Sequence, residues 1–263
     1  MPEGLDKLAG GIGKAVETVP DLYEDALKPA AQESGKTLAL IPKAINAALS
    51  PLRQWIAQKE YNVAETEKLL AKKLENIEPE KIVTPESYVA VPAMQAISYS
   101  MDSDELRNLY ANLLSKSMCI DTKNSVHPSF VEIIKQMSPI DASVFKIILR
   151  SQLHPLIDMK INTSKDKGGG YRTIYKNISW INNFSYDQLS VSFDNLERMN
   201  LIDISDSYYT HSENYQLVTG THLYAICKAQ VEKSIESDQS YSEERKIMYV
   251  TDLGKLFGEI CIQ

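Results

Sequence analysis

The chain has 263 residues and a formal net charge of −7 at pH 7, with 43% hydrophobic and 24% charged residues. These values are ordinary for a soluble globular protein of one large or two modest domains. The acidic balance argues against broad nucleic-acid binding, which needs a basic surface to neutralise phosphates. The three cysteines are far apart and form no CxxC or Cys/His pair. We therefore expect reduced thiols in the cytoplasm, with no disulfide and no zinc site.

Residues 1–60 are predicted to be a helical, locally basic N-terminal region. No acidic residue occurs between Glu33 and Glu60, and we call residues 34–59 the basic amphipathic segment. Its apolar residues recur at steps of three and four, so a helix would place them on one stripe with basic residues on the opposite face. The residues expected to contact a membrane or a partner are Lys36, Leu38, Ile41, Lys43, Ile45, Leu49, Leu52, Arg53, Trp55 and Ile56.

Three interpretations of this segment are open: burial in the core, contact with a membrane surface, and packing between protomers. The single sign of its charge and Trp55 near its end favour the interfacial interpretations, because aromatic rings favour the lipid–water boundary. The segment is not an ordinary transmembrane helix, since prolines and charged residues interrupt every run of about 18 apolar residues. The first residues lack the features of a secretory signal. We expect a cytoplasmic protein, with peripheral attachment to the inner membrane as an alternative.

Residues 61–150 are predicted to be a core of packed helices. A cluster at 101–105 has the serine and carboxylates that open a helix, where the helix dipole favours negative charge. The apolar spacing predicts helices at 61–77, 85–100, 106–117, 128–137 and 141–150. The fold class is therefore mainly α, with a helical bundle in the N-terminal and central parts.

Residues 176–263 are predicted to form a winged-helix-like α+β module. A helix at 186–200 runs into an alternating strand at 201–205, and a second strand at 246–250 leads into a capped helix. This order of helix, strand, strand and helix is typical of a winged helix. A polar insertion spans 206–245, with a possible extra element at 217–231. Residues 160–175, which include Gly168, Gly169 and Gly170, are predicted to be a flexible loop between the modules.

The predicted recognition helix does not suit duplex DNA. It carries Asp187, Asp194 and Glu197 against a single base, Arg198. Base readout and phosphate contacts both favour Arg, Lys, Asn or Gln on the exposed face. We therefore expect a protein-interaction module that does not bind duplex DNA.

No set of residues in the sequence predicts catalysis. The four histidines have no HExxH spacing, and no lysine follows Gly170 to make a phosphate loop. We expect a protein that is not an enzyme, with no catalytic residues, no metal ligands and no cofactor.

The central block resembles a known family. The residues that carry the resemblance are DELRNLYANLL from Asp104 to Leu114 and VHPSFVEIIKQMSPIDA from Val126 to Ala142, with a looser echo in VTDLGKLF from Val250 to Phe257. These strings are similar to the Abi-alpha family, bacterial proteins associated with abortive infection, and the similarity runs from about residue 30 to 150. It implies phage defence by a cell-arresting or cell-killing factor that is silent until infection. The family has no established catalytic residues to transfer.

Three mechanisms remain open. The chain is a non-enzymatic effector that acts through its amphipathic helices on the inner membrane or on a partner protein; or it is an oligomeric scaffold whose winged helix senses a phage component; or it is a winged-helix transcriptional regulator. The partners expected are a second copy of the chain, a phage-encoded trigger protein and an anionic membrane surface.

Overall fold

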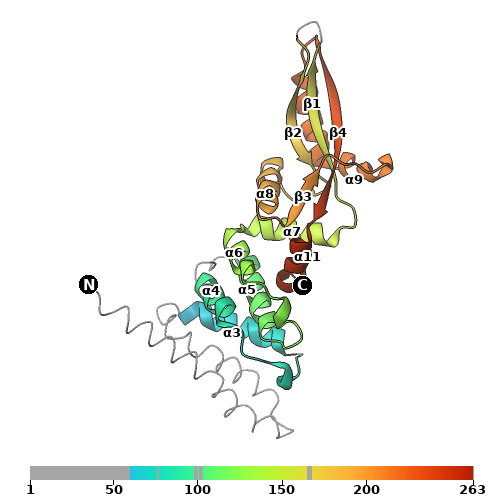
Figure 1. The fold of residues 1–263 in the computed structure, drawn as a ribbon. Coiled ribbons are helices and arrows are strands. Elements are labelled where there is room, and N and C mark those ends of the chain that lie inside the picture. The colour runs from blue at the N-terminus through green and yellow to red at the C-terminus, as the bar shows by residue number, and fades with distance from the viewer. Residues whose placement is uncertain (1–59, 76, 98–99, 101–102, 165–167, 263) are drawn as a thin grey trace, which may run out of the picture. The chain divides into compact units, whose positions relative to one another are not determined.

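The computed structural model describes residues 60–262 apart from 76, 98–99, 101–102 and 165–167. The chain divides into two compact units. The first unit contains the residues up to Gln136 together with Glu259–Gln263, and the second unit is Met137–Gly258. The described part of the protein is mainly helical, with a four-stranded antiparallel sheet in the second unit (Figure 1).

The first unit is a helical core built around α5 (Asp104–Ser117), which contacts α3 (Glu60–Leu74), α4 (Ser87–Ile97) and α6 (Ser129–Gln136). The expected start of α5 is confirmed, because the Ser103 hydroxyl accepts a hydrogen bond from the Leu106 N–H at 3.2 Å. Short turns η1 (Pro79–Lys81) and η2 (Lys123–Ser125) connect these helices. All of the final turn η5 (Gly258–Ile262) except Gly258 also belongs here, and the Asn112 side chain donates to the Cys261 carbonyl at 2.6 Å.

The sheet of the second unit has the strand order β2-β1-β4-β3. Its strands are β1 (Pro155–Thr163), β2 (Tyr171–Ile178), β3 (Ile202–Ser205) and β4 (Gln239–Val250), and Figure 1 shows β1, β2 and β4 as long neighbouring strands. Within residues 160–175, predicted to be a flexible loop, 160–163 instead form the end of β1 and 171–175 the start of β2. That prediction was wrong because it gave too much weight to Gly168, Gly169 and Gly170. These three glycines, all with positive φ, occupy only the turn between the two strands.

Helices cover one face of the second unit's sheet. Its first face presents Ile157, Met159 and Ile161, which pack in a common core with Val218 of α9 (Gln216–Thr219) and Val231 of α10 (His222–Lys233). Residues 206–245, expected as a polar insertion with one extra element, contain η4 (Ser212–Tyr215), α9, α10 and the first half of β4. The strand expected at 246–250 therefore begins seven residues earlier, at Gln239.

Hydrogen bonds at the starts of two helices connect them to neighbouring parts of the second unit. Helix α7 (Pro139–Arg150) opens with a capping box between Ser138 and Asp141, and the buried Asp141 carboxylate also accepts from the Asn195 amide of α8 (Tyr186–Arg198) at 2.8 Å. Helix α11 (Asp252–Phe257) begins at Thr251, whose hydroxyl donates to the Asn200 carbonyl at 2.6 Å.

The predicted order of helix, strand, strand and capped helix is present as α8, β3, β4 and α11. However, β1 and β2 belong to the same sheet, and β4 lies between β1 and β3. The mainly helical fold class with an antiparallel C-terminal sheet is thus confirmed, while a winged-helix module stays a prediction.

Candidate functional site

The residues predicted to contact a membrane or a partner lie outside the described residues. This set contains Lys36, Leu38, Ile41, Lys43, Ile45, Leu49, Leu52, Arg53, Trp55 and Ile56, all of which precede Glu60. The described residues instead show which surfaces the sheet and α8 of the second unit offer.

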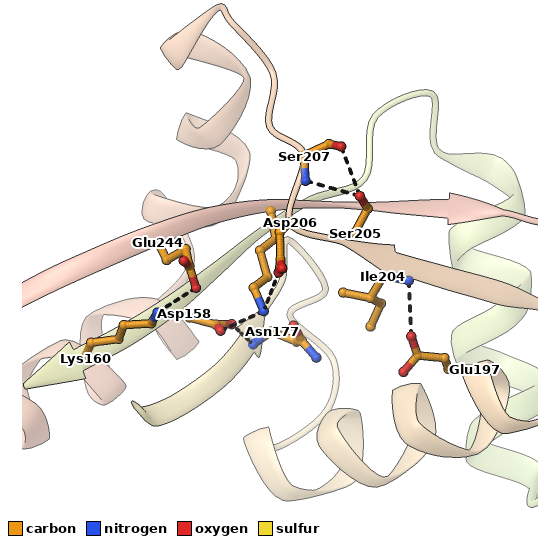
Figure 2. Close-up of polar contacts among 10 residues, drawn as sticks. Asp158, Lys160, Asn177, Glu197, Ile204, Ser205, Asp206, Ser207 and Glu244 are labelled. Atoms are coloured by element: carbon orange, nitrogen blue, oxygen red, sulfur yellow. Dashed lines mark hydrogen bonds and ion pairs between the residues drawn. The ribbon is translucent and has the colours of Figure 1, made fainter. Parts of the chain in front are cut away.

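The outward face of α8 is acidic. Asp187, Asp194 and Glu197 are exposed, and Val191 between them is 68% exposed. Glu197 also accepts a hydrogen bond from the Ile204 N–H of β3 at 3.3 Å (Figure 2). The guanidinium of Arg198, the only base of this helix, donates to the Asn195 side-chain oxygen at 2.7 Å. This face therefore repels phosphate and offers an apolar contact at Val191.

The second face of the sheet carries a group of ion pairs, which we call the sheet cluster (Asp158, Lys160, Asp206, Glu244 and Lys246). Asp158, which is 2% exposed, pairs with the Lys246 ammonium at 3.0 Å, and Asp206 pairs with the same ammonium at 3.3 Å. Lys160 pairs with Glu244 at 2.7 Å (Figure 2). The cluster thus joins β1, β4 and the loop after β3.

Lys246 remains charged in this setting. Burial lowers its pKa, but the hydrogen bonds and negative charges of Asp158 and Asp206 outweigh burial, so the net pKa lies above the ordinary value of 10.5. The hydrogen bond from Lys160 to Glu244 likewise raises the pKa of Lys160. Both ammonium groups are therefore protonated at neutral pH and act as structural cations.

Asn177 places a third strand against the cluster. Its backbone N–H donates to the Asp158 carboxylate at 2.7 Å (Figure 2), and its φ of 56° places it in the left-handed region. Asparagine tolerates this conformation better than most residues. The pairing of β1 with β2 is irregular at this position, since Ile157 lies opposite Ile178 while Met159 lies opposite Tyr175. The irregular strand thus brings a backbone donor to a buried carboxylate.

A tyrosine cluster lies where α10 meets β4. The hydroxyls of Tyr224 and Tyr241 both donate to one Glu243 carboxylate oxygen, each at 2.5 Å. Burial, followed by the hydrogen bond to Glu243, raises the pKa of Tyr224 to about 12 and also raises that of Tyr241. Both phenols are therefore neutral donors at physiological pH, which ties α10 to the strand.

These groups connect the strands and helices of the second unit. Within the described residues, no group of three or more His, Cys, Asp or Glu residues has the arrangement of a metal site. Sequence reasoning missed Asp158, Lys160, Glu244 and Lys246. Their signal was opposite charge at alternate positions of two strands, but the pairing of those strands is not visible in a single sequence.

Comparison with known proteins identifies one family. The model of the family described as "Abortive infection alpha" matches residues 58–261. No curated protein and no solved structure gives a significant match. The match covers both units, so it extends well beyond the central block and tail in which the resemblance was first visible. In the part of the chain that the structure describes, no helix is long and apolar enough to cross a membrane.

Proposed function

Because the chain belongs to the abortive infection alpha family, which implies a role in phage defence, we propose that it acts as a binding protein whose basic amphipathic segment contacts the inner membrane. The family match begins at residue 58, where this segment ends. The observation that carries the proposal is the partition of charge: the segment has Lys36, Lys43, Arg53 and Lys59 and no acid, in a chain of net charge −7.

The energies expected for such a contact suit reversible attachment. Burial of a large apolar side chain such as Ile45 or Leu49 contributes about 1.5–3 kcal/mol before ordering costs. Each basic residue near an anionic lipid surface adds about 1 kcal/mol. The sum supports a peripheral protein that is recruited on activation, and it falls short of permanent anchoring.

A phage challenge of bacteria that carry the gene tests this proposal. The double substitution Ile45→Asp and Leu49→Asp places two charges on the apolar stripe and should abolish protection. The second unit should keep its thermal unfolding transition, because neither residue belongs to Met137–Gly258. Full protection by this variant would rule out the apolar stripe as the effector surface.

A second function is favoured for the second unit by the acidic face of α8. We propose that α8, β3, the end of β4 and α11 act as a winged-helix-like module that senses a phage protein and does not read DNA. Exposed Val191, flanked by Asp187 and Asp194, suits an apolar and basic protein surface. An anisotropy titration with duplex DNA at low salt should show no binding. Micromolar affinity that falls steeply with added salt would instead support the transcriptional regulator.

A further inference from the structure

The outward face of α4 in the first unit is uncharged. Helix α4 contains no Asp, Glu, Lys, Arg or His, whereas α3, α5 and α6 all carry charged residues. Its inward side chains, among them Val89, Ala93 and Met94, are buried. Tyr88 is 58% exposed, and Val91 and Pro92 are half-buried on the outer side. We call these three residues the α4 face.

Pro92 adds a polar feature to this apolar surface. Proline has no backbone N–H, so the carbonyl of Tyr88 lacks the usual helical hydrogen bond from the residue four positions later. Backbone carbonyls are strong acceptors that are normally paired. The α4 face therefore combines apolar side chains with a backbone carbonyl that lacks its usual helical donor.

We propose that the α4 face is the resting-state docking surface for the chain's own basic amphipathic segment, an inference that rests on the proposed function. The stripe that would contact lipid on activation must be covered beforehand, because large exposed apolar patches are uncommon on soluble proteins. The segment ends at Lys59, immediately before α3, and α3 and α4 both contact α5. The segment is therefore tethered to the same helical core that contains α4.

Length and charge agree with this occupant. Residues 38–56 would span at most about 28 Å as helix, with kinks at Pro42 and Pro51, against roughly 16 Å for α4, so the stripe is long enough to cover the face. Helix α4 brings no cation to repel Lys36, Lys43 or Arg53, and the exposed Glu86 immediately precedes it. Docking and membrane contact use the same apolar stripe, so they exclude each other. Release from α4 is then the activating step.

Trp55 provides a reporter for docking in the full chain. The chain has two tryptophans, so Trp180→Phe leaves Trp55 alone. In this background we expect Trp55 emission at a shorter wavelength than in urea. Val91→Asp, and separately Tyr88→Ser, should shift the emission to the red, while Val191→Asp on the exposed face of α8 should not. Because Tyr88 is largely exposed, Tyr88→Ser reports on docking without disturbing the core.

The outcomes separate docking from membrane binding. A Trp55 emission that matches urea in the parent, or that neither α4 variant moves, overturns the docking inference. A red shift on dilution of the parent also overturns it, because a second copy would then cover the face. We expect the α4 variants to bind vesicles containing phosphatidylglycerol at least tenfold more tightly than the parent. If they show the red shift without this gain, docking stands and the membrane proposal fails.

Discussion

At the scale of single residues, the second unit depends on charges that its own strands neutralise. Asp158 is almost fully buried, yet it meets the Lys246 ammonium and the Asn177 N–H within 3.0 Å. A buried charge that loses its partner is far more costly than an exposed one. The stability of the second unit should therefore fall strongly when Lys246 is removed and only slightly when a surface lysine is removed.

Substitution of Lys246 by Met should destabilise the protein by about 3 kcal/mol, because it leaves Asp158 buried without its counter-ion. Lys255→Met is the matched control, since Lys255 pairs with Asp252 at 2.9 Å with both side chains largely exposed. That change should cost at most about 1 kcal/mol. Urea titrations of both variants give the comparison, and equal losses would show that the sheet cluster contributes no more than a surface pair.

Tyr224 predicts a dependence of stability on alkaline pH. Its pKa is raised from 10.0 to about 12 by burial and by Glu243, so the folded state holds the phenolic proton more tightly than the unfolded state. This contribution to stability is fully present below pH 10 and is lost as the pH rises towards 12. Tyr224→Phe should therefore flatten the fall in the free energy of unfolding over this range, whereas Tyr208→Phe at an exposed position should keep the parental slope.

At the scale of elements, the helices and their starts were predictable from the sequence. The strands β1 and β2 and the first half of β4 were not. Ser103, Ser138, Ser185 and Thr251 each cap a helix from within a few residues, so a local pattern is enough. β1 and the first half of β4 contain charged residues that look solvated in sequence. Their burial follows from pairings such as Lys160 with Glu244, which are more than eighty residues apart. Such non-local pairing has no single-sequence signal.

The junction between β3 and α11 permits no side chain at Gly254. A Cβ atom there would lie 2.1 Å from the Leu201 carbonyl oxygen, and this oxygen belongs to the backbone and cannot move away easily. Gly254→Ala should destabilise the second unit by about 3 kcal/mol, the upper end of ordinary overpacking costs. Lys255→Ala, on the same helix and exposed, serves as control. A melting temperature of Gly254→Ala equal to that of the control would contradict the close approach of α11 to β3.

The pairing of β1 with β2 determines where proteases should cut. Lys160, Arg172 and Lys176 lie within paired strands, so trypsin should spare these sites in the native protein. We expect early cuts by a protease of broad specificity in the exposed loop from Asp206 to His211. Mass spectrometry of the first fragments gives the answer. Early tryptic cleavage after Arg172 or Lys176 would show that β2 opens readily, as a flexible loop would.

At the scale of the whole molecule, family membership assigns the biological setting and the sequence supplies the proposed effector. From the sequence, the candidate site could be predicted only as an amphipathic pattern over residues 36–56. The surface that this segment contacts could not be predicted, because it depends on a partner that lies elsewhere. The resemblance was visible in DELRNLYANLL and HPSF, which lie in the helical core. The family match over residues 58–261 includes the second unit as well as the helical core. The short strings in the helical core could not reveal this extent.

We have proposed that the basic amphipathic segment acts at an anionic membrane. The most direct test of this proposal follows phage protection and membrane potential in cells that carry Lys36→Glu, Lys43→Glu and Arg53→Glu together. The control reverses Lys146, Lys176 and Lys233, which are exposed in the second unit and give the same change in net charge. We predict that the first triple variant loses both protection and infection-induced depolarisation, while the control keeps both. Full protection by the first variant would contradict the claim.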